Sequence, residues 1–181
     1  MNAPLLIAGA GPVGMCAAIA AASRGIGVVV VEAGSADRPA DAKCNTVASR
    51  TMETLRGFGI AQQVRDAGLP DDFPTDVVYA SSVAGPEFTR IGLPSRAERR
   101  PDPFPKGFPD TGWRTPEPFV RVSQLYLNPI LARRMHATPG ITVLHDTEVL
   151  GYEQDAGQVR VQVKDRTGAA RTLTAQYLIG A

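Results

Sequence analysis

Two short, uninterrupted apolar runs near the beginning of the chain predict strands that are buried on both faces. Residues 5–8 are all apolar, and residues 28–31 are four valines. Runs of this length without polar interruptions are typical of parallel strands covered on both sides. Between them, the alanine-rich residues 15–24 end before Gly25, which predicts a helix with a glycine stop. Together the three segments predict one right-handed βαβ unit.

The middle of the chain has a different pattern. Residues 50–58 and 60–67 carry apolar side chains at helical spacing, and Ser49 is placed to cap the first of these helices. Residues 77–81 then resemble a strand, and residues 88–91 are its expected hairpin partner across the turn at residues 84–86. The sequence therefore predicts two short helices followed by an excursion of antiparallel strands.

A proline-rich segment follows the predicted hairpin. Prolines recur every few residues from Pro94 to Pro118, so neither a helix nor a central strand is expected to persist there. A loop of this length in a compact domain is usually a functional lid or a disordered linker. The segment and the residue after it carry several aromatic side chains, which favour a packed loop. These are Phe104, Phe108, Trp113 and Phe119.

The last part of the chain predicts one helix and then a series of strands. The helix covers residues 124–136, and Pro129 either kinks it or marks a restart with Asn128 as its cap. Turn signals separate the later strands into an antiparallel meander that ends in one more apolar strand. The predicted strands are 141–144, 148–153, 159–163, 171–175 and 177–179.

Composition narrows the possible functions. A net charge of +1 gives no electrostatic reason to expect nucleic acid or an anionic membrane as a partner. Cys16 and Cys44 have no CxxC spacing, and His136 and His145 have no metal-ligand spacing, so neither a disulfide framework nor a metal site is predicted. The first apolar run is too short for a signal or a membrane span, and a cytoplasmic location is expected.

The strongest motif lies between the first strand and the first helix. Gly9, Gly11 and Gly14 form a GxGxxG pattern, and Glu32 ends the second strand eighteen residues after the last glycine. In this context the first glycine permits the tight turn, the second lets a pyrophosphate approach the backbone, and the third allows close helix–strand packing. The helix amino terminus attracts phosphate, and the carboxylate can accept hydrogen bonds from a ribose diol. These residues predict a dinucleotide site.

The motif alone does not distinguish FAD from NAD, because both contain an ADP half. A dehydrogenase domain would continue with further βα units after Glu32, whereas this chain proceeds through helices, a hairpin, a proline-rich loop and a meander. Tyr79 and Trp113 could face an aromatic substrate, although packing explains both equally well.

Several further blocks make the chain similar to the class A flavoprotein aromatic monooxygenases, the para-hydroxybenzoate hydroxylase and phenol hydroxylase group. Besides the glycine motif and Glu32, the resemblance rests on residues 50–55 with 58–60, on 121–124 and on 177–181. It implies an α/β fold: a Rossmann-like FAD-binding βαβ domain of the glutathione-reductase type, with an antiparallel meander and a partial substrate-domain excursion. The implied segments are 1–75 and a truncated 121–181 for FAD binding, with 76–120 belonging to the substrate domain.

The resemblance also assigns cofactor contacts by position. The glycines, with Pro12, would line the FAD pyrophosphate, and Glu32, with Ala33, would bind the adenosine ribose. Arg50 would lie near the pyrophosphate or flavin, since a planar guanidinium suits paired phosphate oxygens. Gln124 would contact the ribityl or flavin region, and the backbone of Val149 would lie beside the adenine.

The implied activity is hydroxylation of a phenol-like aromatic substrate with FAD, NAD(P)H and O2. The chain ends at Ala181, before the further Asp-Gly and Gly-Asp motifs of that group, so we expect an amino-terminal fragment, a truncated product, or one half that needs a complement. The candidate macromolecular partners are a complementing carboxy-terminal half and a second copy of the chain in a homo-oligomer. No catalytic acid or base is assigned. The alternatives are a related epoxidase or reductase, a non-catalytic dinucleotide-binding fragment that needs a complementing chain, and a NAD-dependent dehydrogenase domain.

Overall fold

The computed structural model describes residues 2–39, 42–99, 102, 107 and 115–181. The chain forms two compact units, each with its own internal packing. Unit 1 comprises Met1–Ala42 and Gln124–Ala181, and unit 2 comprises Lys43–Ser123. Residues 43–75 therefore pack with residues 76–120, so the boundaries of the compact units differ from those of the three sequence segments.

Unit 1 is built on the predicted βαβ unit. Strand β1 (Asn2–Ala8), helix α1 (Pro12–Ala22) and strand β2 (Val28–Val31) follow one another, and β1 pairs in parallel with β2. The chain leaves α1 through Gly25, whose φ of +80° is the left-handed conformation that a glycine stop supplies.

One six-stranded sheet contains all the long strands of unit 1. Its order is β7-β2-β1-β10-β9-β8, where β7, β2, β1 and β10 are parallel and β9 and β8 are antiparallel to their neighbours. The four later strands are β7 (Ile141–Leu144), β8 (Thr147–Gln154), β9 (Val159–Asp165) and β10 (Ala170–Gly180). The parallel part and the meander thus form a single sheet.

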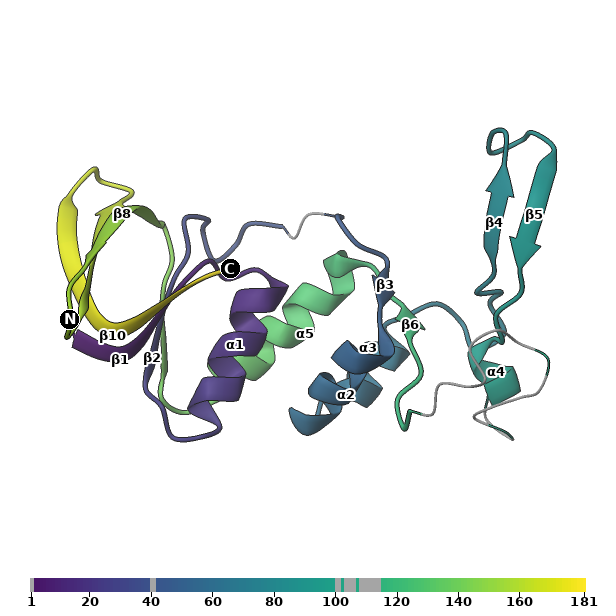
Figure 1. The fold of residues 1–181 in the computed structure, drawn as a ribbon, viewed down its shortest axis with the longest axis horizontal. Coiled ribbons are helices and arrows are strands. Elements are labelled where there is room, and N and C mark those ends of the chain that lie inside the picture. The colour runs from purple at the N-terminus through teal and green to yellow at the C-terminus, as the bar shows by residue number, and fades with distance from the viewer. Residues whose placement is uncertain (1, 40–41, 100–101, 103–106, 108–114) are drawn as a thin grey trace. The chain divides into compact units, whose positions relative to one another are not determined.

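Helix α5 (Gln124–His136) precedes β7 and lies beside α1 (Figure 1). It is continuous through Pro129, so the alternative in which the helix restarts after Asn128 is wrong. Helix α1 packs against β1, β2 and β7.

The other face of the parallel strands is covered by the meander. Leu6, Val29 and Val31 belong to one buried cluster with residues of β9 and β10, among them Val161 and Leu173. The intervening residues of β1 and β2 point the opposite way because side chains alternate along a strand. Both faces are covered, which is why these runs contain no polar residue.

Strand β10 corrects the prediction of two separate strands at 171–175 and 177–179. It runs unbroken through Gln176, because its first half pairs with β9 and its second half pairs with β1. The polar Gln176 interrupts the apolar pattern at the point where the strand changes partner, and no turn occurs there.

The strands of unit 2 are short and form two separate pairs. Strands β3 (Thr46–Val47) and β6 (Val120–Arg121) pair in antiparallel fashion, as do β4 (Val77–Ala80) and β5 (Glu87–Ile91), which form the predicted hairpin. Neither pair is joined to the sheet of unit 1 by strand hydrogen bonds. Helices α2 (Ser49–Gly57) and α3 (Ala61–Asp66) confirm the two predicted helices.

Two details of unit 2 differ from the prediction. Ser49 is the first residue of α2 and not its cap; Ala48 holds that position and no side chain caps the helix. A four-residue helix, α4 (Arg96–Arg99), occurs within the proline-rich segment. It is stabilised by a capping box in which Ser95 Oγ accepts from Glu98 N at 3.3 Å and Ser95 N donates to Glu98 Oε2 at 2.7 Å.

No helix in the described ranges is both long enough and apolar enough to span a membrane.

Candidate cofactor site

The turn between β1 and α1 is closed so tightly that two of its glycines tolerate no side chain. Gly9 has a φ of +111° and donates its N–H to the Val31 carbonyl at 2.8 Å. A Cβ on Gly9 would lie 2.1 Å from the carbonyl oxygen of Ala181, and one on Gly14 would lie 2.0 Å from the carbonyl oxygen of Gly9. These two glycines are required by the packing of strand against helix.

Gly11 is different, because the protein itself does not fill the space beside it. A Cβ there would meet no atom within 4 Å, and its φ of −68° is accessible to any residue. Gly11 is the N-cap of α1, no side chain caps that helix, and Pro12 stands in its first turn. The uncapped amino terminus of α1 therefore adjoins open space, which is the arrangement a phosphate needs.

Glu32 connects the end of β2 to this glycine turn. Its Oε2 accepts a hydrogen bond from the Ala10 N–H at 2.6 Å, and its Oε1 accepts one from the Gly34 N–H at 2.7 Å. Each carboxylate oxygen can accept a further hydrogen bond, so the half-buried group can still receive ribose hydroxyls. Ala33, between Glu32 and Gly34, is exposed at the same position.

The beginning of β8 lies directly beside Glu32. Thr147 donates its N–H to the Glu32 carbonyl at 2.9 Å, and Asp146 donates its N–H to the Gly34 carbonyl at 3.1 Å. Val149 is two residues beyond Thr147, so its backbone N–H and carbonyl point toward the same edge of β8. Because β8 is an outer strand of the sheet, this edge is unpaired at Val149, while the valine side chain packs against the core.

Gln124 lies at the same end of the sheet as the glycine turn, and connectivity explains why. Helix α1 follows β1 and therefore begins at the carboxyl ends of the parallel strands. Helix α5 precedes the parallel strand β7, so it runs back across the sheet and also begins at the carboxyl ends. Gln124 is the first residue of α5. Unit 1 thus brings seven of the nine predicted residues to the carboxyl ends of its parallel strands: Gly9, Gly11, Pro12, Gly14, Glu32, Ala33 and Gln124. The eighth, Val149, lies on β8 two residues after Thr147, whose N–H is bonded to the Glu32 carbonyl.

Arg50, the ninth predicted residue, belongs to unit 2. It lies in the first turn of α2 with its side chain 90% exposed, and its Nη1 is 3.6 Å from Glu53 Oε2. Such an exposed ion pair contributes little to stability. Most of the guanidinium faces solvent, so the group remains available to a ligand.

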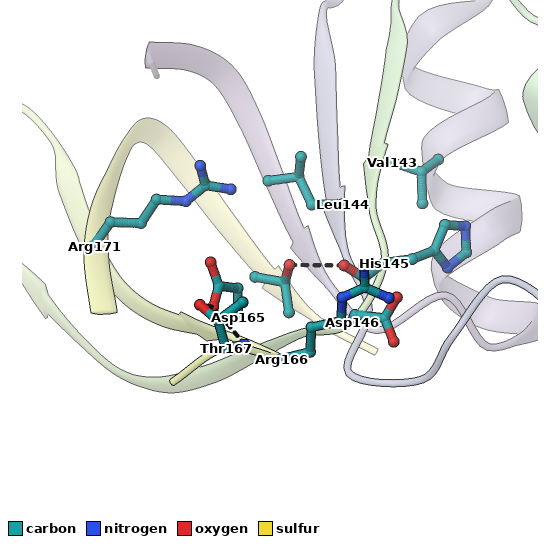
Figure 2. A pocket seen from close by; sticks show the side chains of 9 residues that line it. Val143, Leu144, His145, Asp146, Asp165, Arg166, Thr167 and Arg171 are labelled. Carbon is teal, nitrogen blue, oxygen red and sulfur yellow. Dashed lines mark hydrogen bonds between the residues drawn. The ribbon is translucent and has the colours of Figure 1, made fainter. Parts of the chain in front are cut away.

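An open cavity of about 450 Å³ lies next to the Glu32 loop, because Asp146 and Thr147, which donate to the carbonyls of Gly34 and Glu32, are among its lining residues (Figure 2). None of the nine predicted cofactor residues lines it. Asp165, one of the residues that line it, accepts hydrogen bonds from the hydroxyl and the N–H of Thr167, and these hold the pKa of its carboxyl below the usual value. Its lining is polar or charged apart from two residues, and comprises Val143, Leu144, His145, Asp146, Thr147, Asp165, Arg166, Thr167 and Arg171.

Sequence reasoning missed the backbone groups that fix Glu32. The N–H groups of Ala10 and Gly34 orient its carboxylate, and only the nearness of Gly34 in sequence could have suggested one of them. Of the weaker candidates, Tyr79 is 54% exposed on β4 and Trp113 lies outside the described residues. The rings of His136 and His145 are 6.2 Å apart, and no group of three possible metal ligands exists within the described part of the chain.

Comparison with known proteins shows to which family this arrangement belongs. The family model described as FAD binding domain matches residues 2–181. A 2,4-dichlorophenol 6-monooxygenase of Cupriavidus pinatubonensis is 33% identical over 98% of this chain, and a phenol 2-monooxygenase of Pseudomonas sp. is 34% identical over 98%. A 3-(3-hydroxy-phenyl)propionate/3-hydroxycinnamic acid hydroxylase of Paraburkholderia xenovorans is 28% identical over 100%.

The chain spans only about a quarter of the length of these relatives: 28%, 28% and 26% respectively. Among solved structures, the flavin-dependent monooxygenase PieE in complex with FAD and substrate matches 100% of this chain and 30% of its own, with a TM-score of 0.82 and 28% identity. The mixed parallel and antiparallel sheet, the glycine turn and the match along nearly the whole sequence agree. The chain belongs to the FAD binding domain family, in which its similar proteins are flavin-dependent aromatic monooxygenases.

Proposed function

We propose that this chain is the FAD-holding portion of a monooxygenase that hydroxylates a phenol-like aromatic substrate with NAD(P)H and O2. The observation that carries the proposal is the Glu32 carboxylate fixed 2.6 Å from the backbone N–H of the glycine turn, beside the open space at Gly11. A ribose held by that carboxylate would place the attached diphosphate at the amino terminus of α1.

Each predicted residue has a distinct task in this proposal. Gly9 and Gly14 allow the close turn, while Gly11 and Pro12 leave the phosphate position unobstructed. Glu32 and Ala33 receive the adenosine ribose, the backbone of Val149 pairs with the adenine edge, and Gln124 contacts the ribityl chain or flavin.

Arg50 adds positive charge for the pyrophosphate or flavin. When bound, FAD supplies the redox and oxygen chemistry, and the protein contributes position, electrostatics and exclusion of water. The finer structural assignment is also part of the proposal: a glutathione-reductase type FAD domain formed by segments 1–75 and 121–181, with 76–120 contributing to a substrate domain. Two free cysteines are compatible with the cytoplasmic location that we expect.

The test is FAD binding by the purified 181-residue chain, measured by equilibrium dialysis and by the visible flavin spectrum. We expect FAD to bind more tightly than NAD. Gly11→Leu should keep the fold, since its side chain meets nothing within 4 Å, and should lose FAD because the side chain would occupy the phosphate position. Gly92→Leu is the matched control: its Cβ also meets nothing, and it should leave FAD binding unchanged.

A second pair of variants isolates the carboxylate. Glu32→Gln should weaken FAD binding about tenfold or more, because a charge-assisted hydrogen bond to the ribose is lost. Glu148→Gln, which removes a carboxylate from an exposed ion pair with Lys164, should have no effect. Equal affinity of the folded chain and its Gly11→Leu variant for FAD would overturn the proposed site.

The remaining alternatives give different outcomes. A dehydrogenase domain would bind NAD more tightly than FAD. A non-catalytic fragment would retain FAD weakly or not at all, would not oxidise NAD(P)H by itself, and would gain activity only after addition of a complementing chain.

A further inference from the structure

Helix α2 begins with a charge that does not suit its own dipole. Arg50 is the second residue of the helix, where the backbone N–H groups present the positive end of the dipole. No described side chain caps this turn, and the exposed ion pair of Arg50 with Glu53, at 3.6 Å, offsets little of the cost. A basic residue at this position therefore favours binding of an anion over stability of the helix.

Glu53 contacts a different group with each of its two carboxylate oxygens. Its Oε1 accepts a hydrogen bond from the Thr115 hydroxyl at 2.7 Å, and its Oε2 faces Arg50 Nη1. Thr115 is buried, and its hydroxyl oxygen accepts the Glu117 N–H at 3.1 Å. The carboxylate is thus fixed on one side by a buried group and faces the guanidinium on the other.

The segment that carries Thr115 is itself anchored to helix α3. Arg65 pairs closely with the Glu117 carboxylate and donates to the Pro118 carbonyl at 3.0 Å. Both side chains of the ion pair are mostly buried, with 14% of each exposed. A continuous series of polar contacts therefore runs from α3 through this segment to the first turns of α2.

We propose that Glu53 is a positioning residue that holds the Arg50 guanidinium ready for the diphosphate or flavin, and that Thr115 fixes Glu53 for this task. The inference rests on the proposed function and deepens it by naming the residues that orient one cofactor contact. A long arginine side chain loses rotamer freedom on binding, and a fixed carboxylate removes part of that freedom beforehand. A glutamate without an anchor could not do so, and the Thr115 hydroxyl supplies the anchor.

The sign of one effect separates positioning from simple charge. FAD affinity of the 181-residue chain and of Glu53→Gln is measured by equilibrium dialysis. If Glu53 acted only as a negative charge near a diphosphate, its removal would relieve repulsion and strengthen binding. Positioning predicts that Glu53→Gln weakens binding about fivefold, which is the range of a single exposed ion pair. Unchanged or tighter binding would overturn the proposal.

A double-mutant cycle tests whether Glu53 acts through Arg50. Arg50→Met should weaken FAD binding about tenfold or more, because a charge-assisted contact is lost. Adding Glu53→Gln to Arg50→Met should then change the affinity by less than about twofold, since the residue that Glu53 positions is absent. A second fivefold loss in the double variant would show that Glu53 serves the fold alone, and would refute the proposal.

Two further comparisons isolate the anchor and the location of the ion pair. Thr115→Ser keeps the hydroxyl and should retain most of the affinity, whereas Thr115→Val should lose as much as Glu53→Gln; equal losses in the two Thr115 variants would contradict the anchoring. Glu87→Gln is the matched control, because Glu87 also pairs with an arginine three residues away, Arg90, in the same unit. It should leave FAD binding unchanged, and a fivefold loss there would contradict the assignment to Glu53.

A measurement on the FAD-free chain needs no cofactor. Nitrogen-15 relaxation of the Arg50 Nε–H group, assigned by its disappearance in Arg50→Met, should give a lower order parameter in Glu53→Gln than in the parent chain. Equal order parameters would overturn the positioning role. Failure of the parent chain to bind FAD would refute the proposed function and this inference with it, whereas equal FAD affinity of the parent and Arg50→Met would refute this inference alone.

Discussion

Strands β2 and β4 have similar valine-rich sequences and opposite environments. All four valines of β2 are buried, with at most 6% of any of them exposed. In β4, Val77, Val78 and Tyr79 are 37%, 44% and 54% exposed. The difference shows that a local apolar pattern predicts a strand, while the partners of that strand determine whether its side chains are buried.

The partners differ in number and kind. Strand β2 lies between β1 and β7, with α1 on one face and the meander cluster on the other. Strand β4 pairs with β5 alone in a two-stranded sheet. A hairpin with one partner gains little from burial, whereas an inner strand of a covered sheet gains from every side chain.

The largest expected effect tests the close packing that distinguishes unit 1. Gly14→Ala would put a Cβ 2.0 Å from the Gly9 carbonyl oxygen, so helix and strand must separate. We expect a loss of about 3 kcal/mol in the free energy of unfolding, as overpacking at a backbone contact produces. Urea unfolding followed by circular dichroism measures it.

The control for this variant is Gly92→Ala in unit 2, where the new Cβ meets nothing within 4 Å. It should shift the unfolding free energy by about 0.5 kcal/mol or less. Similar losses in the two variants would show that the turn between β1 and α1 is less tightly closed than the structure indicates.

A smaller effect is expected from truncating one valine in each of the two strands. Val30→Ala removes methyl groups from a side chain with 0% exposure and should cost about 2 kcal/mol. Val78→Ala removes them from a side chain that is 44% exposed and should change the unfolding free energy by about 0.5 kcal/mol or less. Hydrogen exchange read separately for β2 and β4 locates each change; equal costs would abolish the contrast between the strands.

Unit 1 was largely predictable from sequence because its signals are local. Continuous apolar runs, an alanine-rich helix and glycines at fixed spacing each act within a few residues, and together they predicted β1, α1, β2 and the glycine turn. Glu32 was predictable for the same reason, since it directly follows the second valine run.

The remaining features depend on contacts between distant segments. The change of partner within β10 cannot be read from residues 170–180, because it reflects the positions of β1 and β9. The fixing of Glu32 by Ala10, and of Arg121 by Thr46 and Thr75, joins residues 22, 75 and 46 positions apart. Such long-range contacts leave no periodicity in the sequence.

The smallest effect on stability comes from the two cysteines, one in each unit. Burial raises the pKa of the Cys16 thiol in α1 to about 11 from its ordinary value of 9.0, so at neutral pH it is about a hundredfold less ionised than an ordinary thiol. Cys44 in unit 2 is exposed. Because the thiolate is the reactive form, a disulfide reagent at pH 8 should label Cys44 quickly and Cys16 slowly.

The same shift predicts the pH dependence. The folded state favours the neutral thiol of Cys16, so this contribution to stability is fully present below about pH 9 and declines as the pH rises toward 11. Cys16→Ala should therefore reduce the alkaline loss of stability, while Cys44→Ser should leave it unchanged and should abolish the fast labelling phase. If Cys16→Ala abolishes the fast phase instead, the Cys16 thiol is accessible and α1 is not packed against the sheet as described. The contrast between the buried thiol of unit 1 and the exposed thiol of unit 2 would then be wrong.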